Sequence, residues 1–365
     1  MGAQPEEHHP RTIESSCGRV TRTLPGPSPS ALQLGTLFIL LSSSLTLAIQ
    51  GDSKFAAAEK LYAAHKLPEA EALYQTIRSD DRNFSQALRR LGGIYYLTGR
   101  PALAEEKFAQ YAQLQDSAEA YTLLAGVQFD LRKFDQANES AQHAIRLDHG
   151  YYKAFTALGM IHAELGDWPG AENAYREALR LNGRDPDTWF LMGRGYFKRN
   201  DFEKAKDAFQ ESLHLGPQQV RTYTNLALTM EAMAEDDAAE KVLQQGVKVG
   251  EALAQPDVAA CVDYGIFLFK HGRDAESLEV LRQAIKASPG DAEAHYELAR
   301  CLFRMKQFDE AAAEAETALR LRGPEYKVHY LLSRIYTALG DTQNAARHAQ
   351  EAAHLADQKL SFTKE

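Results

Sequence analysis

The feature that most constrains this chain is a period of about 34 residues that begins at Gly51 and runs almost to the end. Every repeat has a small residue at its position 8 and again at its position 20. A period of this length means that one structural unit recurs and stacks on its neighbours, so chain length does not give the number of domains. The repeat starts fall at Gly51, Ser85, Ala118, Tyr152, Pro186, Val220, Val258, Ala292 and Tyr326.

Small residues in fixed columns indicate two helices that cross closely, with large side chains at the flanks of the crossing. Position 7 is mostly Leu and position 24 is mostly aromatic or Leu, as Leu158 and Tyr175 illustrate in the fourth repeat. Between these columns lie residues that adopt a left-handed backbone at little cost. We therefore predict a helix, a tight turn and a second helix in each repeat, with turns at Gly99, Gly166, Asn200, Gly272 and Gly340.

This pattern resembles the tetratricopeptide repeat, and the fifth repeat carries its residues best: Trp189, Met192, Gly193, Tyr196, Ala205, Phe209 and Pro217. The resemblance implies an all-α fold, an α-solenoid in which about nine helix-turn-helix repeats form a right-handed superhelix. We expect a leader at residues 1–50, repeats at 51–359 and a tail at 360–365. The sixth repeat has four extra residues near Ala252 to Pro256, so its second helix or the following loop is expected to be longer.

In the family geometry, positions 2, 5, 6, 9, 12 and 13 of each first helix line a concave groove. In repeats five to nine these positions hold eight basic and five acidic residues, a balance of +3, whereas repeats one to four give −2. The whole chain carries a formal charge of −9, so the sign of the groove departs from that of the chain. The candidate partner-binding residues are Phe190, Arg194, Phe197, Lys198, Arg221, Asn225, Phe269, Lys270, Tyr296, Arg300, Phe303, Arg304, Tyr330 and Arg334.

These residues predict a scaffold that binds a protein or peptide with acidic and apolar character, because aromatic and arginine side chains are the usual energetic anchors of such contacts. The alternative interpretation is that the aromatic residues pack against the next repeat and that the charges form a solvated face. A second alternative is a membrane-anchored or cytosolic adaptor that uses the same groove. The acidic chain lacks the overall basic field of nucleic-acid binders, so no nucleic acid is expected as a partner.

An enzyme is the least favoured class, and we expect no catalytic residue, no metal and no cofactor. The sequence has no phosphate-binding glycine loop, no His-Glu-x-x-His and no nucleophile elbow. His295 and His329 occupy one column of adjacent repeats and are expected to be buried, packed or hydrogen-bonded histidines. His348 and His354 are expected on the polar outer face of the last helix, and Cys261 and Cys301 are not expected to form a disulfide.

The first 50 residues predict a targeting signal. Basic residues precede the apolar run at residues 32–49, which is typical of a secretory signal peptide, with a cut expected after Ala48. A retained membrane anchor and an ordinary buried helix are the alternatives. The sequence therefore predicts an exported protein, periplasmic or secreted, similar to tetratricopeptide proteins of the bacterial envelope, or else a protein anchored by residues 32–49.

Overall fold

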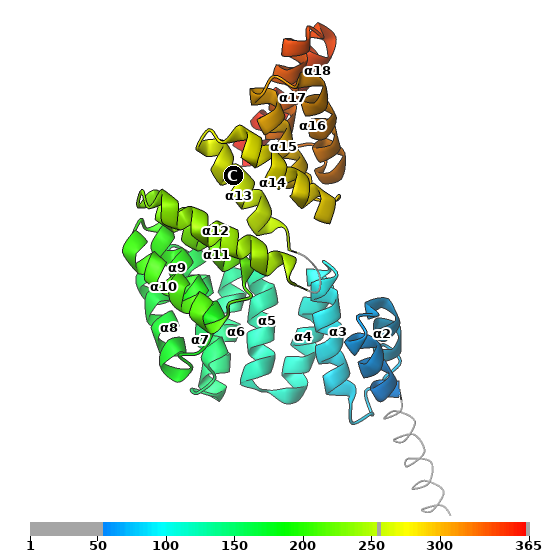
Figure 1. The fold of residues 1–365 in the computed structure, drawn as a ribbon. Coiled ribbons are helices and arrows are strands. Elements are labelled where there is room, and N and C mark those ends of the chain that lie inside the picture. The colour runs from blue at the N-terminus through cyan, green and yellow to red at the C-terminus, as the bar shows by residue number, and fades with distance from the viewer. Residues whose placement is uncertain (1–53, 254–256, 363–365) are drawn as a thin grey trace, which may run out of the picture. The chain divides into compact units, whose positions relative to one another are not determined.

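The computed structural model describes residues 54–253 and 257–362, and this part of the chain is built from helices joined by short turns (Figure 1). The chain divides into two compact units, with the boundary between Leu91 and Gly92. The prediction of an all-α fold of helix-turn-helix repeats is confirmed. The leader at residues 1–50, with its expected signal peptide or anchor at 32–49, lies outside the described residues.

The helices alternate between first and second members of each repeat. A helix at residues 54–63 pairs with α2 (Leu67–Tyr74) in the first repeat. The later first helices are α3 (Phe84–Leu97), α5 (Ala118–Asp130), α7 (Tyr152–Glu164), α9 (Pro186–Lys198), α11 (Val220–Ala232), α13 (Ala259–Lys270), α15 (Ala292–Arg304) and α17 (Tyr326–Leu339). Their second helices are α4 (Pro101–Gln115), α6 (Phe134–Leu147), α8 (Trp168–Leu181), α10 (Phe202–Leu215), α12 (Asp236–Glu251), α14 (Asp274–Ala287), α16 (Phe308–Arg322) and α18 (Thr342–Phe362).

The two columns of small residues lie where the helices of a repeat cross. Ala residues at position 20, such as Ala171 and Ala205, are fully buried. At position 8, a Cβ added to Gly159 would lie 2.5 Å from a ring carbon of Tyr175 in the second helix. In this repeat the Tyr175 ring occupies the space that a side chain at residue 159 would need, so the glycine allows the two helices to cross closely. Large residues at position 24 thus fill the crossing, as the sequence predicts.

Each turn between the helices of a repeat contains one residue with positive φ. The five residues predicted to adopt this conformation do so, with φ between 60° at Asn200 and 80° at Gly166. Four further turns place a non-glycine residue there, although an L-residue in this region costs about 1–2 kcal/mol. These four are His65, Arg132, Ala234 and Lys306, at φ values of 56°, 58°, 60° and 62°.

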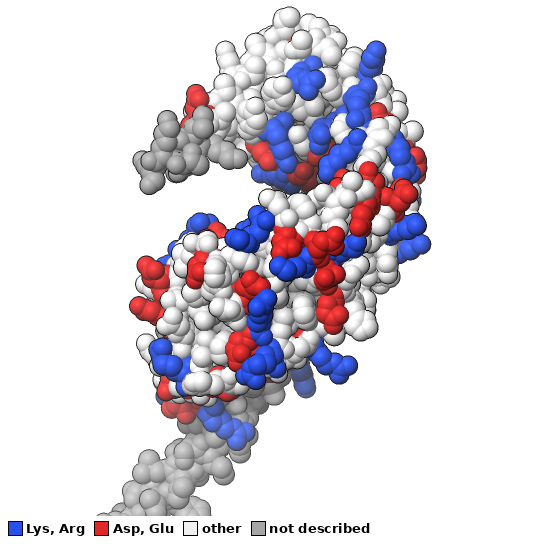
Figure 2. All heavy atoms as spheres, turned by 90° about the vertical axis from the view of Figure 1, so that its left-hand side faces the viewer, with Lys and Arg blue, Asp and Glu red and all other residues white. Residues whose placement is uncertain are grey.

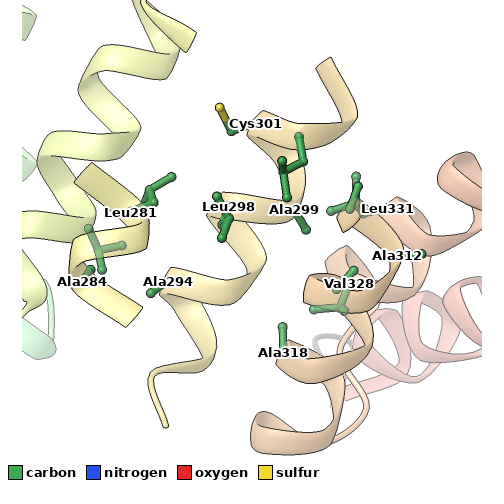
Figure 3. Close-up of a cluster of buried hydrophobic side chains, with 14 of the residues drawn as sticks. Leu281, Ala284, Ala294, Leu298, Ala299, Cys301, Ala312, Ala318, Val328 and Leu331 are labelled. Atoms are coloured by element: carbon green, nitrogen blue, oxygen red, sulfur yellow. The ribbon is translucent and has the colours of Figure 1, made fainter. Parts of the chain in front are cut away.

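The core continues from one repeat to the next. Figure 3 shows side chains of α14, α15, α16 and α17 that converge on one cluster, with Leu281 and Leu298 on one side and Val328 and Leu331 on the other. In that cluster Leu281, Ala299 and Leu332 are fully buried. Each helix pair therefore buries apolar surface against its neighbour, which is how a repeat array gains its stability.

Several helices begin with a side-chain cap. The carboxylate of Asp185 accepts a hydrogen bond from the backbone N–H of Thr188 at 2.9 Å, and Asp291 accepts one from Ala294 at 2.8 Å. Such caps satisfy backbone donors that the helix itself leaves free.

The second helix of the sixth repeat was expected to be longer than its counterparts, and this is confirmed. Helix α12 has 16 residues, whereas the neighbouring second helices α10 and α14 have 14 each.

Candidate functional site

Aromatic rings and cations alternate along the first helices of the last three repeats. The guanidinium carbon of Arg304 lies 3.5 Å from the ring centroid of Phe269, and that of Arg300 lies 4.8 Å from the same centroid. Arg300 also approaches Tyr296 at 5.8 Å, and the Lys327 ammonium lies 4.6 Å from Tyr296. We name these five residues the cation–ring row. Distances of this size permit an attraction of about 0.5–2 kcal/mol for each pair.

The row has a simple register, because each cation belongs to the repeat after the ring that it covers. Arg300 and Arg304 of α15 cover Phe269 of α13, and Lys327 of α17 covers Tyr296 of α15. The same arrangement occurs elsewhere: Arg221 lies 4.4 Å from Phe190, Arg334 lies 4.9 Å from Phe303 and, in the first unit, Arg90 lies 4.8 Å from Tyr62.

Most of the predicted cations also have a carboxylate of the same chain beside them. Arg300 pairs with Glu297 at 2.6 Å, and Lys327 pairs with Glu293 at 3.0 Å. Figure 2 shows the general consequence on one face of the molecule, where Lys and Arg lie beside Asp and Glu. Further pairs join Arg221 to Asp187 at 2.5 Å, Lys270 to Glu231 at 3.5 Å, and the Arg304 Nε to Asp274 at 2.8 Å.

Three predicted cations differ from the others. In the part of the chain that the structure describes, Arg194, Lys198 and Arg334 are exposed and form no ion pair with an acidic side chain. Arg194 approaches the Phe190 ring at 5.9 Å, and Arg334 approaches Tyr330 at 5.9 Å. Among the predicted cations, these three are therefore the ones that no carboxylate of the described chain neutralises.

The predicted aromatic residues divide into packed and exposed ones. Phe197 meets Phe202 edge to face at 5.6 Å, and Phe303 meets Phe308 at 5.7 Å, so both are partly buried against the second helix of their own repeat. Phe190 is buried, whereas Tyr330 is 50% exposed. Phe197 and Phe303 thus pack within their own repeats and not against the next repeat, as the alternative interpretation supposed, and Tyr330 remains exposed.

The acidic residues of this face have shifted pKa values. Burial raises the pKa of Glu297, although Arg300 works in the opposite direction. Burial also raises the pKa of Asp263, which accepts a hydrogen bond from Thr224 at 2.8 Å. At Glu293 burial is outweighed by Lys327 and Arg322, so its pKa is lowered. Of these three carboxylates, Glu293 and Glu297 are therefore held by cations and Asp263 by a threonine hydroxyl.

Some residues behave in ways that the sequence did not predict. The Asn225 amide donates to the backbone carbonyl of Arg221 at 2.8 Å, within its own helix, so part of its hydrogen-bonding capacity is used there. Asp274 was not predicted as part of this face, because it belongs to a second helix, α14, and pairs with Arg304 of the next repeat. Tyr326 was also missed, yet it is 47% exposed and its ring stacks on Tyr330 at 6.0 Å.

The prediction for the last helix is wrong at His348. This residue is buried rather than on the outer face, and its Nδ1 lies 2.9 Å from the Nδ1 of His329. It packs in parallel against the Tyr336 ring at 5.6 Å, because the inner face of α18 is turned toward α17. His295 and His329 are buried and hydrogen-bonded, as expected; His295 contacts Glu314 at 2.5 Å.

The described residues offer little for metal or thiol chemistry. Within residues 54–253 and 257–362, no group of three or more His, Cys, Asp or Glu side chains could hold a metal ion. Cys261 and Cys301 are buried free thiols, and burial raises the pKa of Cys261 to about 11. A thiol with so high a pKa is a poor nucleophile near neutral pH. Among the helices that are described, none is long and apolar enough to cross a membrane.

Comparison with solved structures supports the fold. The chain is similar to yeast Tom70, with a TM-score of 0.58, 17% identity, and coverage of 85% of this chain and 62% of that one. It is also similar to the APC/C hetero-tetramer Cut9-Hcn1, with a TM-score of 0.53, 16% identity, and coverage of 77% and 55%. These likenesses concern the fold alone, and the chain spans less than two thirds of either structure.

A curated relative is the inactive TPR repeat-containing thioredoxin TTL3 of Arabidopsis thaliana, which is 30% identical over 91 residues. The match covers 25% of this chain and 13% of that protein. Tetratricopeptide repeat models match residues 232–292 and 268–335, so the predicted repeat family is confirmed.

The model of the cilia and flagella-associated protein 70 C-terminal domain matches residues 48–261, which is more than half of the chain. The expectation of an exported protein of the bacterial envelope, periplasmic or secreted, is therefore wrong. It depended on the apolar run at residues 32–49, and the features of a signal peptide there were too general to identify a compartment. By this match, the chain belongs to the family of the cilia and flagella-associated protein 70 C-terminal domain, a family of tetratricopeptide repeats.

Proposed function

We propose that this chain is a non-catalytic scaffold that binds a protein segment along the first helices of repeats five to nine, within an assembly associated with cilia or flagella. The observation that carries the proposal is a recurring pair on these helices, an aromatic residue followed by an arginine four residues later. Phe190 and Arg194, Tyr296 and Arg300, and Tyr330 and Arg334 form these pairs. Tyrosine and arginine are enriched among the residues that dominate binding energy at protein interfaces.

The charge distribution favours an acidic partner. Arg194, Lys198 and Arg334 are exposed cations without an ion pair in the described part of the chain, and long-range attraction by such groups accelerates association with an acidic surface. The paired cations of the cation–ring row instead stabilise contacts between repeats. The family supports the location, since its name refers to cilia and flagella.

The test combines site-specific cross-linking with localisation. A photo-reactive amino acid is placed at Thr337, on the first helix α17, or at Ala313, on the second helix α16; both residues are exposed. In ciliated cells that express the tagged full chain, we expect cross-linked adducts from Thr337 and few from Ala313, and we expect the tag in the ciliary fraction. Equal adducts from both positions, or absence of the tag from cilia, would contradict the proposal.

A further inference from the structure

Repeats eight and nine carry the same residues at positions 5 and 9 of their first helices and differ at position 6. Both have tyrosine at position 5 and arginine at position 9, namely Tyr296 and Arg300 in α15 and Tyr330 and Arg334 in α17. Position 6 is Glu297 in repeat eight but Leu331 in repeat nine. The two repeats therefore form a natural comparison in which one carboxylate is present or missing.

In repeat eight the carboxylate is used internally. Glu297 is only 5% exposed, and its two oxygens accept hydrogen bonds from Nη1 of Arg300 at 2.9 and 2.6 Å. The ring of Tyr296 is covered by Lys327 of the next repeat. Both the cation and the ring of this repeat are thus already occupied by groups of the same chain.

In repeat nine neither group is occupied in this way. Leu331 is 6% exposed and packs into the core, so it offers nothing to Arg334, which has no ion pair within the described residues. Tyr330 and Tyr326 stack on each other and are each about half exposed. The same helix face therefore presents an unneutralised guanidinium beside two open rings.

Repeat five shows that the missing carboxylate alone is not enough. It also has leucine at position 6, Leu191, and Arg194 likewise lacks an ion pair. Its ring, however, is buried: Phe190 is 4% exposed and lies under Arg221. Only in repeat nine, among these three described repeats, do an open ring and an unpaired arginine occur together.

We propose that repeat nine binds a carboxylate of an acidic protein segment, which pairs with Arg334 as Glu297 pairs with Arg300 one repeat earlier. An apolar side chain next to that Asp or Glu lies on the ring pair of Tyr326 and Tyr330. The inference rests on the proposed scaffold function and assigns one of its anchor points. Charge complementarity selects the partner, because an aspartate or glutamate restores the ion pair that Leu331 cannot make.

The test uses peptides selected by the full chain from a displayed random library of dodecamers, then measured one at a time by fluorescence anisotropy. We expect enriched peptides with Asp or Glu beside an apolar residue. Their Kd should rise about tenfold or more in Arg334→Ala, because a hydrogen bond to a charged group is lost. Arg320→Ala, an exposed arginine on the second helix α16, serves as the matched control and should leave Kd unchanged.

A second variant supplies the missing carboxylate from within the chain. Leu331→Glu reproduces the residue of repeat eight and should occupy Arg334, so that binding falls as in Arg334→Ala. Circular dichroism and thermal unfolding establish whether this variant folds; Arg334→Ala carries the test if it does not.

The outcomes separate this inference from the proposed function. Peptides that depend on Arg194 or Lys198 but not on Arg334 would overturn the inference and leave the scaffold function standing. Enriched peptides without acidic residues would also overturn it. If no peptide is enriched, or if none responds to any first-helix variant, both the inference and the proposed function are contradicted.

Discussion

The first helices of repeats three and four differ sharply from those of repeats seven to nine. On α5 and α7 some of the predicted groove positions are small or aliphatic, namely Gly126, Met160 and Ala163, and the charged ones are mainly acidic: Glu119, Asp130 and Glu164, with Lys153 as the one cation. A Cβ at Gly126 would meet no atom within 4 Å. On α13, α15 and α17 the same positions hold the cation–ring row and its carboxylates. The crossings beneath both faces nevertheless use the same small residues. The positions that form the helix crossings are therefore separate from the positions that determine the character of the exposed face.

The largest effect is expected when the same substitution, glycine to alanine, is made at a helix crossing and on the exposed face of a first helix. Gly159→Ala should lower the free energy of unfolding by about 1–3 kcal/mol, because the added methyl group would overlap the Tyr175 ring. Gly126→Ala should be neutral or stabilise by up to about 1 kcal/mol, since alanine favours a helix. Urea unfolding monitored by circular dichroism measures both. Similar losses for the two variants would show that crossing and face are not separate.

The next largest effect concerns the charged face of the later repeats. Arg300→Ala leaves Glu297 buried without its ion pair, and we expect a loss of about 1–3 kcal/mol at neutral pH. Burial already raises the pKa of Glu297, so the folded state binds this proton more tightly than the unfolded state. The stability of the variant should therefore recover as the pH falls, relative to the parent chain. Thermal unfolding across pH 4.5–7.5 measures this, and Arg300→Ala with Glu297→Gln should remove the pH dependence.

A smaller effect is expected where the array ends in α17 and α18. Burial lowers the pKa of both His329 and His348, and at His348 the cation of Arg347 acts in the same direction. The unfolded state then binds protons more readily, so stability should decrease as the pH falls below the ordinary histidine value of 6.5. Hydrogen exchange at pH 7.5 and 5.5, expressed as protection factors, should show lower protection of the α18 amides at the lower pH. The protection factors of the α5 and α6 amides serve as the internal control and should not fall in the same way.

The smallest predicted effect is at the turn of repeat six. Ala234 has φ of 60°, which glycine adopts without the strain imposed by a side chain. Ala234→Gly should therefore stabilise the chain by a few tenths to about 1 kcal/mol, the relief of strain being offset in part by greater freedom of the unfolded chain. The reverse change at Gly166, Gly166→Ala, should destabilise by about 1 kcal/mol. A lower urea midpoint for Ala234→Gly would contradict the argument.

The sequence was sufficient for the fold because its determinants are local and periodic. The columns represented by Gly159, Tyr175 and Ala171 identify the helix crossing without any knowledge of the neighbouring repeat. A turn was predicted in every repeat, but the positive φ of Ala234 and Lys306 was not, since neither residue favours it and the two helices impose the conformation. Periodicity therefore predicts elements better than the exceptions within them.

The candidate face was predicted less completely because its contacts join different repeats. The sequence indicates that Arg300 and Arg304 lie on a first helix, but not that both cover Phe269 of the preceding repeat. It also makes Arg304 a candidate partner-binding residue, although Asp274 of a second helix pairs with it. His348 shows the same limitation, since its burial depends on how α18 rotates against α17. These outcomes depend on the register between repeats, which a single sequence does not give.

The way each cation covers the ring of the repeat before it has a consequence for how such an array can change over time. A repeat from this part of the chain is matched to its predecessor through Arg300 and to its successor through Tyr296. Duplicating or deleting one unit would join surfaces that were never fitted to one another, leaving a ring uncovered on one side and a charge misplaced on the other. Substitutions at these positions should therefore be inherited in pairs across the boundary, so that each repeat constrains the evolution of its neighbour.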